Sequence, residues 1–264
     1  MPPLTAAREA VLFDTADFLL NHRRTGVPVE DLPLQLRPVT EQEAFFVQDT
    51  MIRAYGEIGG WKIGARTPDG VPFFAPMPEA WMGENGTLFR GPMHRLHGVE
   101  AEIAFQFVRD LPPRAELYTR DEVAAAIGSC HPAIEIIESA IKDPLAVARE
   151  SMFADMQMHG GFVAGPAVPQ WTEIDWQNEP VRLMVDGSVR EERVASNPGG
   201  VDFLRLLTFL ANEGAVRTGG LRAGQWVTTG SWTGVTWATP SAEVRVEFGH
   251  AGRVSMQFES KKEV

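Results

Sequence analysis

Cysteine is almost absent from this sequence, which has one, Cys130, among its 264 residues. A single thiol excludes disulfide bonds within the chain and zinc sites built from several thiolates. This usage is typical of proteins from a reducing compartment, so we expect a cytoplasmic location. The first twenty residues include charged side chains, Arg8 and Asp14 among them, which the apolar segment of a signal peptide would not contain.

Basic residues are also in short supply. The 24 lysines and arginines are outnumbered by 35 aspartates and glutamates, which gives a net charge of −11. Nucleic acids and anionic membrane surfaces are bound chiefly through basic patches, so we expect neither as a partner. No apolar run approaches the roughly 20 residues that a membrane span requires. A small anionic substrate stays compatible with this charge if its site supplies local positive charge.

Several familiar catalytic and nucleotide-binding motifs are missing as well. The sequence contains no Walker motif, no G-x-G-x-x-G after a strand and no G-x-S-x-G nucleophile motif. Cys130 has no recognisable activating context, and the histidines show no paired ligand spacing on a helix. Carboxylates and a lysine are therefore the main candidates for chemistry.

What the sequence does contain is a helical beginning followed by a mostly β remainder. Apolar periodicity predicts helices over 12–22 and 40–55, the second opened by a capping box at Thr40–Glu43. Later helices are predicted from 119 to the break at His131-Pro132, over 143–153 and over 201–211. The predicted strands are 61–63, 99–107, 133–137, 160–165, 181–194 (a hairpin), 225–229, 242–248 and 253–258. We predict one α+β catalytic domain over 1–264, with a helical N-terminal region (1–58) and a mixed-β core (59–264).

Two glutamates share one face of the predicted strand 99–107. Alternation directs Glu100 and Glu102 the same way, about 7 Å apart. Like charges this close are tolerated cheaply only in open water or around a cation, and for the pair alone a solvated strand edge is the simpler explanation. Glu135 shifts the balance, because an unpaired carboxylate among the apolar residues of 133–137 would be costly. Three such carboxylates form an oxygen-ligand set for Mg²⁺ or Mn²⁺.

Lys62 is the second candidate, in the short strand Trp61-Lys62-Ile63 between glycines. A surface lysine explains this local pattern equally well. Beside a metal-bound anionic substrate, the ammonium could instead neutralise a carboxylate or transfer a proton. In the turn 230–234, a tight connection between strands is the simpler interpretation, although the hydroxyl of Ser231 could bind a ligand.

Taken in order, these segments resemble the fumarylacetoacetate hydrolase superfamily, within it the 2-oxopent-4-enoate hydratase and 4-oxalocrotonate decarboxylase branch. The matching segments are Thr40–Gln48, Gly60–Gly64, Val99–Phe105, Ala133–Ile137, Ala154-Asp155 with Gly161–Gly165, Leu221–Gly224 and Thr228–Ser231. Any one of them is weak, but seven in the family order span nearly the whole chain.

The resemblance implies a mixed β-sandwich or roll with peripheral helices, assembled as a homo-oligomer. It also implies a divalent metal, Mg²⁺ or Mn²⁺, held by Glu100, Glu102 and Glu135, with Lys62 as the active-site lysine. Asp155 is expected to be a second catalytic residue, and Ser231, Arg66 and His159 are expected to bind substrate. In such hydratases the metal chelates the 1-carboxylate and 2-oxygen of a 2-hydroxydienoate, and water adds at carbon 4 to give a 4-hydroxy-2-oxo acid.

The chain departs from the family pattern in two places. The hydratase segment Pro-Asp-Phe-Gly, whose Asp is often assigned an acid/base role, corresponds to residues 71–78, which contain no carboxylate. The segment Ala-Asp-Asn-x-Ser-Ser corresponds to Ala154–His159, which keeps the Asp but has lost the Asn and the hydroxyls.

The sequence therefore leaves three functions open. The leading hypothesis is a metal-dependent hydratase acting on a small anionic 2-oxo or 2-hydroxydienoic acid from aromatic catabolism. A decarboxylase of a 2-oxo dioate, or an acylpyruvate C–C hydrolase, would use the same metal site. A non-catalytic ligand-binding homologue is the alternative from another class, motivated by the two departures.

Overall fold

The computed structural model describes residues 3–90 and 95–259. Its α-helices are α1 (Ala6–Thr25), α2 (Glu41–Tyr55), α3 (Arg120–Ala124), α4 (Arg149–Ala154) and α5 (Phe203–Phe209), which continues as a π-helical turn (Leu210–Gly214). Short 3-10 helices cover Leu34–Leu36, Glu79–Trp81, Met156–Met158, Trp171–Glu173 and Ala215–Thr218. The strands are β1 (Ile58–Gly64), β2 (Phe73–Pro78), β3 (Met82–Glu84), β4 (Thr87–Phe89), β5 (Gly98–Phe107), β6 (Ile127–Ile137), β7 (His159–Ala164), β8 (Pro180–Val185), β9 (Ser188–Val194), β10 (Trp226–Thr228), β11 (Thr236–Trp237), β12 (Glu243–Phe248) and β13 (Gly252–Phe258).

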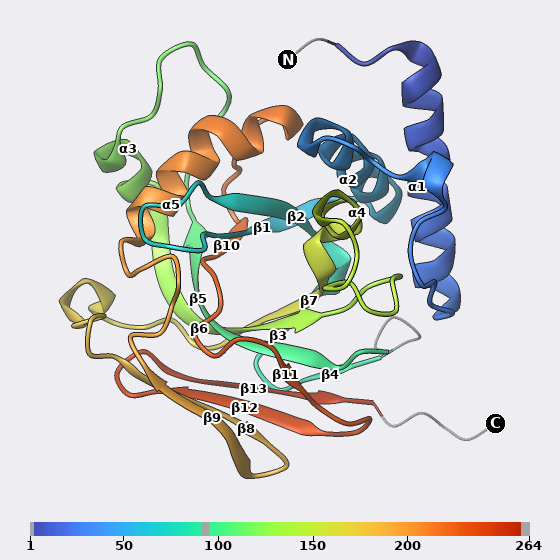
Figure 1. Cartoon of the computed structure of the whole chain (residues 1–264). Coiled ribbons are helices and arrows are strands. Elements are labelled where there is room, and N and C mark those ends of the chain that lie inside the picture. Colours follow the sequence, from blue (N-terminus) through green and yellow to red (C-terminus); the bar gives the residue numbers. More distant parts are fainter. Residues whose placement is uncertain (1–2, 91–94, 260–264) are drawn as a thin grey trace.

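The strands form two sheets, as the α+β fold class predicted. The larger, mixed sheet has the order β2-β1-β10-β5-β6-β7-β3, with β11 paired to β5. The smaller sheet has the order β4-β13-β12-β8-β9. In Figure 1 the larger sheet curls into a roll, and the smaller sheet lies as a second layer beneath it.

The two faces of β5 and β6 have different neighbours. One face, with Val99, Ala101 and Ile103 of β5, is fully buried in the apolar core shared with strands β8, β12 and β13 of the smaller sheet. The opposite face, which carries Glu100 and Glu102, therefore lies inside the roll. Alternation along one strand thus separates a dry layer between sheets from a polar roll interior.

Helices cover the open side of the roll. α2 packs against β2 and α4, and α1 packs against α2 (Figure 1). The N-cap predicted at Thr40 is present, because its hydroxyl accepts a hydrogen bond from the backbone N–H of Glu43. Thr5 caps α1 in the same way, through the N–H of Arg8. Among the described residues, none of the helices combines the length and hydropathy of a membrane span.

The predicted helix from 119 to 131 was wrong beyond its first turns. The Thr119 capping box is present, but α3 ends at Ala124 and β6 begins at Ile127, so His131 and Pro132 lie within a strand. Pro132 is tolerated because its carbonyl faces the β7 side, where it accepts a hydrogen bond from Gly165. Its missing N–H therefore does not interrupt the ladder with β5.

The helix predicted over 143–153 is also shorter than expected. α4 starts at Arg149, because the preceding segment forms a turn at Asp143. The carbonyl of Asp143 accepts a hydrogen bond from the N–H of Ala146, and its side chain accepts one from the N–H of Leu145. The first helix is longer than predicted, since α1 runs to Thr25 before Gly26 caps it in the left-handed conformation.

Candidate active site

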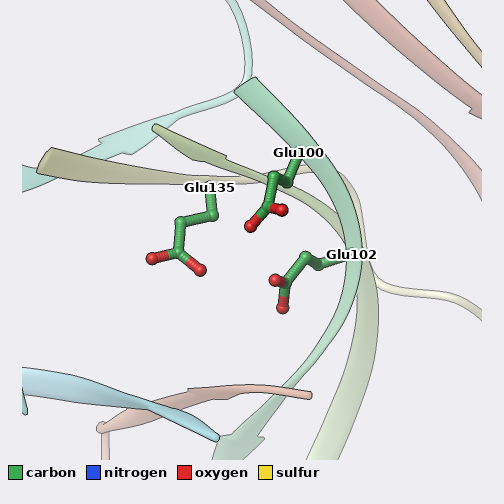
Figure 2. Close-up of side chains that lie close together, drawn as sticks. All are labelled: Glu100, Glu102 and Glu135. Atoms are coloured by element: carbon green, nitrogen blue, oxygen red, sulfur yellow. The ribbon is translucent and has the colours of Figure 1, made fainter. Parts of the chain in front are cut away.

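The register of β5 and β6 brings the three predicted glutamates together. Glu100 is the direct cross-strand partner of Glu135, and Glu102 lies two residues further along β5. Figure 2 shows the three carboxylates converging from these two neighbouring strands. One oxygen from each lies within 4.8 Å of the others, which is close enough for a single cation to contact all three.

Two of the carboxylates, those of Glu102 and Glu135, are held from one side by hydrogen bonds. The hydroxyl of Thr228 and the N–H of Gly230, at 2.8 Å, both donate to Oε2 of Glu102. Oε1 of Glu135 accepts from His159 Nδ1 at 3.0 Å and lies 2.6 Å from Lys62 Nζ. Oε2 of Glu135 is buried and has no hydrogen-bond partner among the described residues. A buried carboxylate oxygen without a donor is the atom that a metal ion would satisfy.

The electrostatics of the cluster also favour the binding of a cation. Burial, together with the charge of Glu135, raises the pKa of Glu100 to about 7. Burial and both neighbouring carboxylates raise the pKa of Glu102 well above its ordinary value. Burial alone would raise the pKa of Glu135, but Lys62 and His159 outweigh it and lower that pKa. One lysine therefore neutralises only part of the charge of three buried carboxylates.

Lys62 is oriented by a strained turn. Its ammonium donates to the backbone carbonyl of Gln157 at 3.1 Å, in addition to its ion pair with Glu135. Met156, Gln157 and Met158 have φ values of 54°, 50° and 63°, so three consecutive non-glycine residues occupy the left-handed region. That conformation costs roughly 1–2 kcal/mol per residue, and such strain clusters at functional sites. Burial would lower the pKa of Lys62, but Glu135 and Glu100 raise it overall, so this side chain is a cation.

A cavity of about 550 Å³ opens over the carboxylates. Its floor consists of Glu100, Glu102, Glu135 and Lys62. Its walls are largely apolar and come from β1, the segment 70–73, α4 and the end of the left-handed turn; they include Ile63, Ala65, Val71, Phe73, Ile137, Met152, Phe153, Met158 and Pro198. Arg66 and Arg149, which are exposed, complete the lining.

Two of the predicted substrate-binding residues line this cavity. Ser231 has a buried hydroxyl that makes no hydrogen bond with the described residues. Arg66 lies on the segment that follows β1. The second arginine, Arg149, stacks on Phe153 and pairs with Glu41 at 2.9 Å.

His159 and Asp155 do not line the cavity, and their expected roles need correction. His159 is fully buried behind Glu135, to which it donates, and it stacks on Trp81 at 5.8 Å between ring centres. Burial lowers its pKa, so the ring is a neutral donor to a metal ligand. Asp155 is fully buried in an ion pair with Arg23 at 2.5 Å. The hydroxyl of Ser139 also donates to Asp155. These contacts connect α1 to the end of β6, and Asp155 does not face a ligand.

Sequence reasoning missed the residues that act through their backbone or at a distance. Gln157 was noticed only as part of a segment that lost its family pattern, yet its carbonyl orients Lys62. Thr228 lies in a matching segment, but nothing in the strand pattern indicated that it would donate to Glu102. Asn197 donates to the carbonyls of Thr229 and Gly230 and so holds the loop that binds Glu102. The signal for all three is their place in the fold.

The residues present fit a divalent metal. Three carboxylates are the donor set of hard cations such as Mg²⁺ and Mn²⁺, and the orphaned oxygen of Glu135 supplies an independent structural reason. The hydrogen bonds to Glu102 and Glu135 fix both side chains before any ion binds. Such pre-orientation is the role that outer donors have in metal sites.

The fold is shared with solved enzyme structures. 4-Oxalocrotonate decarboxylase from Pseudomonas putida G7, complexed with magnesium and adipate, matches with a TM-score of 0.80 and 24% identity, over 98% of this chain and 100% of the other. The calcium and acetate complex of that enzyme gives a TM-score of 0.79 and 23% identity over the same shares of the chains. 2-Hydroxyhepta-2,4-diene-1,7-dioate isomerase from Mycobacterium marinum matches with a TM-score of 0.52 and 16% identity, over 78% of this chain and 77% of the other.

These likenesses confirm the fold that the fumarylacetoacetate hydrolase resemblance implied. At this level of identity they show the fold alone. A scan against models of protein families gives no match, and a search of curated proteins by sequence gives none either.

Proposed function

We propose that the protein is a metal-dependent lyase acting on unsaturated 2-oxo acids, and that its reaction is decarboxylation of a 2-oxo dioate. The carboxylate cluster and Lys62 would bind the 2-oxo carboxylate end of the substrate. The apolar cavity would hold the rest of the chain. 4-Oxalocrotonate decarboxylase shares the fold and is compatible with this reaction class. The composition of the cavity favours it over the hydration that the sequence suggested first.

The head group is recognised at the floor of the cavity. A divalent ion held by Glu100, Glu102 and Glu135 would supply Lewis acidity toward the 2-oxo group. The Lys62 ammonium, held by Glu135 and the Gln157 carbonyl, offers positive charge to the substrate's 1-carboxylate. The Ser231 hydroxyl is a further donor on the same floor.

The observation that favours decarboxylation is the composition of the cavity. Among the described residues, no carboxylate and no histidine lines it apart from the three glutamates proposed to bind the metal. Hydration needs a group that moves the proton of the attacking water, whereas decarboxylation needs only an electron acceptor at the 2-oxygen. The bond from the distal carboxylate to its carbon breaks, its electron pair moves into the conjugated chain, and carbon dioxide leaves. A proton taken up later completes the product.

The apolar walls favour the same step. Phe73, Ile137 and Phe153 would exclude water from the substrate chain, and an anionic carboxylate in such surroundings gains by becoming neutral carbon dioxide. Arg66 supplies positive charge near the anionic substrate.

Hydration of a 2-hydroxy-2,4-dienoate stays the second candidate, because Lys62 lies on the cavity floor and carries exchangeable protons. Hydration would then depend on Lys62 as the proton donor. Decarboxylation needs Lys62 only as a positive charge, so Lys62→Arg should retain part of a decarboxylase activity and abolish a hydratase activity.

The two reactions are separated by their products. The Mg²⁺-loaded protein is incubated with 2-oxohex-3-enedioate and, separately, with 2-hydroxypenta-2,4-dienoate. We expect the dioate to release carbon dioxide. The rate of release should fall about a hundredfold or more in Glu102→Gln but stay unchanged in the exposed Glu116→Gln. Loss of the dienol absorbance without carbon dioxide from the dioate would establish the hydratase instead. Turnover of neither substrate, with metal bound, would favour a non-catalytic binding protein.

A further inference from the structure

A second, smaller cleft lies between the end of α2, the start of β1 and the segment 217–225. Its volume is about 230 Å³, and it shares no lining residue with the cavity over the carboxylates. Three arginines line it, Arg53, Arg217 and Arg222, together with the acids Asp49 and Glu57. Positive charge is therefore in excess here, although the whole chain is strongly acidic.

Arg217 is the arginine of this cleft that its neighbours hold in place. Its guanidinium stacks on Phe45 at 4.2 Å and lies 5.3 Å from the ring centre of Phe74, and its Nη2 donates to Gln48 at 2.9 Å. Two of its nitrogens, Nε and Nη1, are buried and make no hydrogen bond with the described residues. Burial lowers the pKa of Arg217 to about 10, against the opposing effect of the charges of Asp49 and Glu41.

The acids in the cleft do not complete the neutralisation. Asp49 Oδ1 lies 3.3 Å from Arg217 Nε, without the geometry of a hydrogen bond. Glu57 pairs loosely with Arg222, at 3.5 Å, and both side chains are exposed. Arg53 is exposed on α2, one turn after Asp49. An anion in the cleft would face the exposed side chains of Arg53 and Arg222 and the partly exposed side chain of Arg217.

We propose that Arg53, Arg217 and Arg222 form a binding site for a small tetrahedral oxyanion, inorganic phosphate or the phosphate of a small phosphomonoester. Guanidinium groups bind phosphate through paired N–H donors, and three of them around one cleft match a dianion with several acceptor oxygens. The volume admits a phosphate with a few attached atoms but no large ligand.

Calorimetric titration of the Mg²⁺-loaded protein with sodium phosphate, at constant ionic strength, tests this site. We expect saturable binding of one phosphate per chain, weakened about tenfold in Arg53→Gln and in Arg222→Gln. Because both side chains are exposed, these variants should fold normally, whereas replacing Arg217 would also remove packing. Arg109→Gln, an exposed arginine elsewhere, is the matched control for lost charge and should bind like the wild type.

Two further titrations identify the ligand and the site at which it binds. Glu102→Gln, which disables the proposed metal centre, should keep phosphate binding, and its loss there would assign the anion to that centre and overturn the proposal. Glycerol 3-phosphate in place of phosphate distinguishes a phosphomonoester from the free ion as the tighter ligand. The proposal is also overturned if no saturable binding is found, if succinate binds in place of both phosphates, or if the two arginine variants bind like Arg109→Gln.

Discussion

In the part of the chain that the structure describes, Glu135 has one oxygen with two partners and one with none. Lys62 and His159 both contact Oε1, while the buried Oε2 has no donor among these residues. His159 thereby fixes which face of the carboxylate is free, and it does so as a neutral ring because its burial lowers its pKa. We therefore propose that His159 positions a metal ligand rather than touching substrate.

Replacing His159 with phenylalanine tests that role. The ring keeps its packing against Trp81, but Glu135 loses a donor, so we expect divalent-metal affinity to fall about tenfold. Titration with Mn²⁺ followed by electron paramagnetic resonance measures the affinity. Trp81→Phe, which leaves the hydrogen bond in place, is the control and should keep wild-type affinity. Equal affinities in both variants would mean that His159 only fills space.

At the scale of the element, strand alternation was the informative signal. The period of two along 99–107 correctly placed Glu100 and Glu102 on one face, and β-branched residues correctly marked the strand around Glu135. The left-handed turn at Met156–Met158 could not be predicted, because none of its residues is a glycine and it is held by contacts from distant parts of the chain, such as the hydrogen bond from Gln157 to the Phe74 carbonyl. The helix break expected at His131-Pro132 was wrong. Whether a proline can lie within a sheet depends on which neighbouring strand its missing N–H would face, and the local sequence does not show this.

A matched pair of variants at residue 157 measures the strain in that turn. Gln157→Gly and Gln157→Ala both remove the side-chain hydrogen bond to the Phe74 carbonyl, but only alanine must hold a Cβ at a φ of 50°. We expect the glycine variant to be the more stable by about 1 kcal/mol in urea unfolding. A more stable alanine variant would contradict the strain assigned to this turn.

For the whole molecule, the uncompensated carboxylates should make the metal-free protein sensitive to pH. The pKa of Glu100 is raised from 4.5 to about 7, so the folded state holds this proton more tightly than the unfolded chain does. Its contribution to stability is present at low pH and is lost as pH rises from about 4.5 through about 7. We expect the Tm of the metal-free protein to fall across this range.

Two comparisons isolate this effect by calorimetry. Glu100→Gln should show a smaller fall in Tm over the same pH range, and Mg²⁺ should raise the wild-type Tm most at pH 8, where no proton competes with the ion. An identical pH dependence in the wild type and in Glu100→Gln would contradict the pKa assigned to Glu100.

Much of the molecule's architecture was predictable from the sequence, while the roles of individual residues in the site were not. Local patterns and the ordered segments gave the α+β class and the three glutamates, because both depend on short-range spacing. The roles of Asp155 and His159 could not be read this way, since Arg23 reaches Asp155 from more than a hundred residues away in the chain. The predictions of a homo-oligomer and of a single domain over 1–264 stay predictions, and sedimentation tests the first of them.

The central claim is that Glu100, Glu102 and Glu135 hold a divalent ion that receives a 2-oxo carboxylate. Crystals grown with Mn²⁺ and oxalate, a mimic of that head group, test it through the anomalous signal of manganese. We predict one strong peak among the three carboxylates, from a manganese ion that contacts Oε2 of Glu135, with oxalate between the ion and Lys62. A manganese peak elsewhere, or oxalate bound away from Lys62, would contradict it.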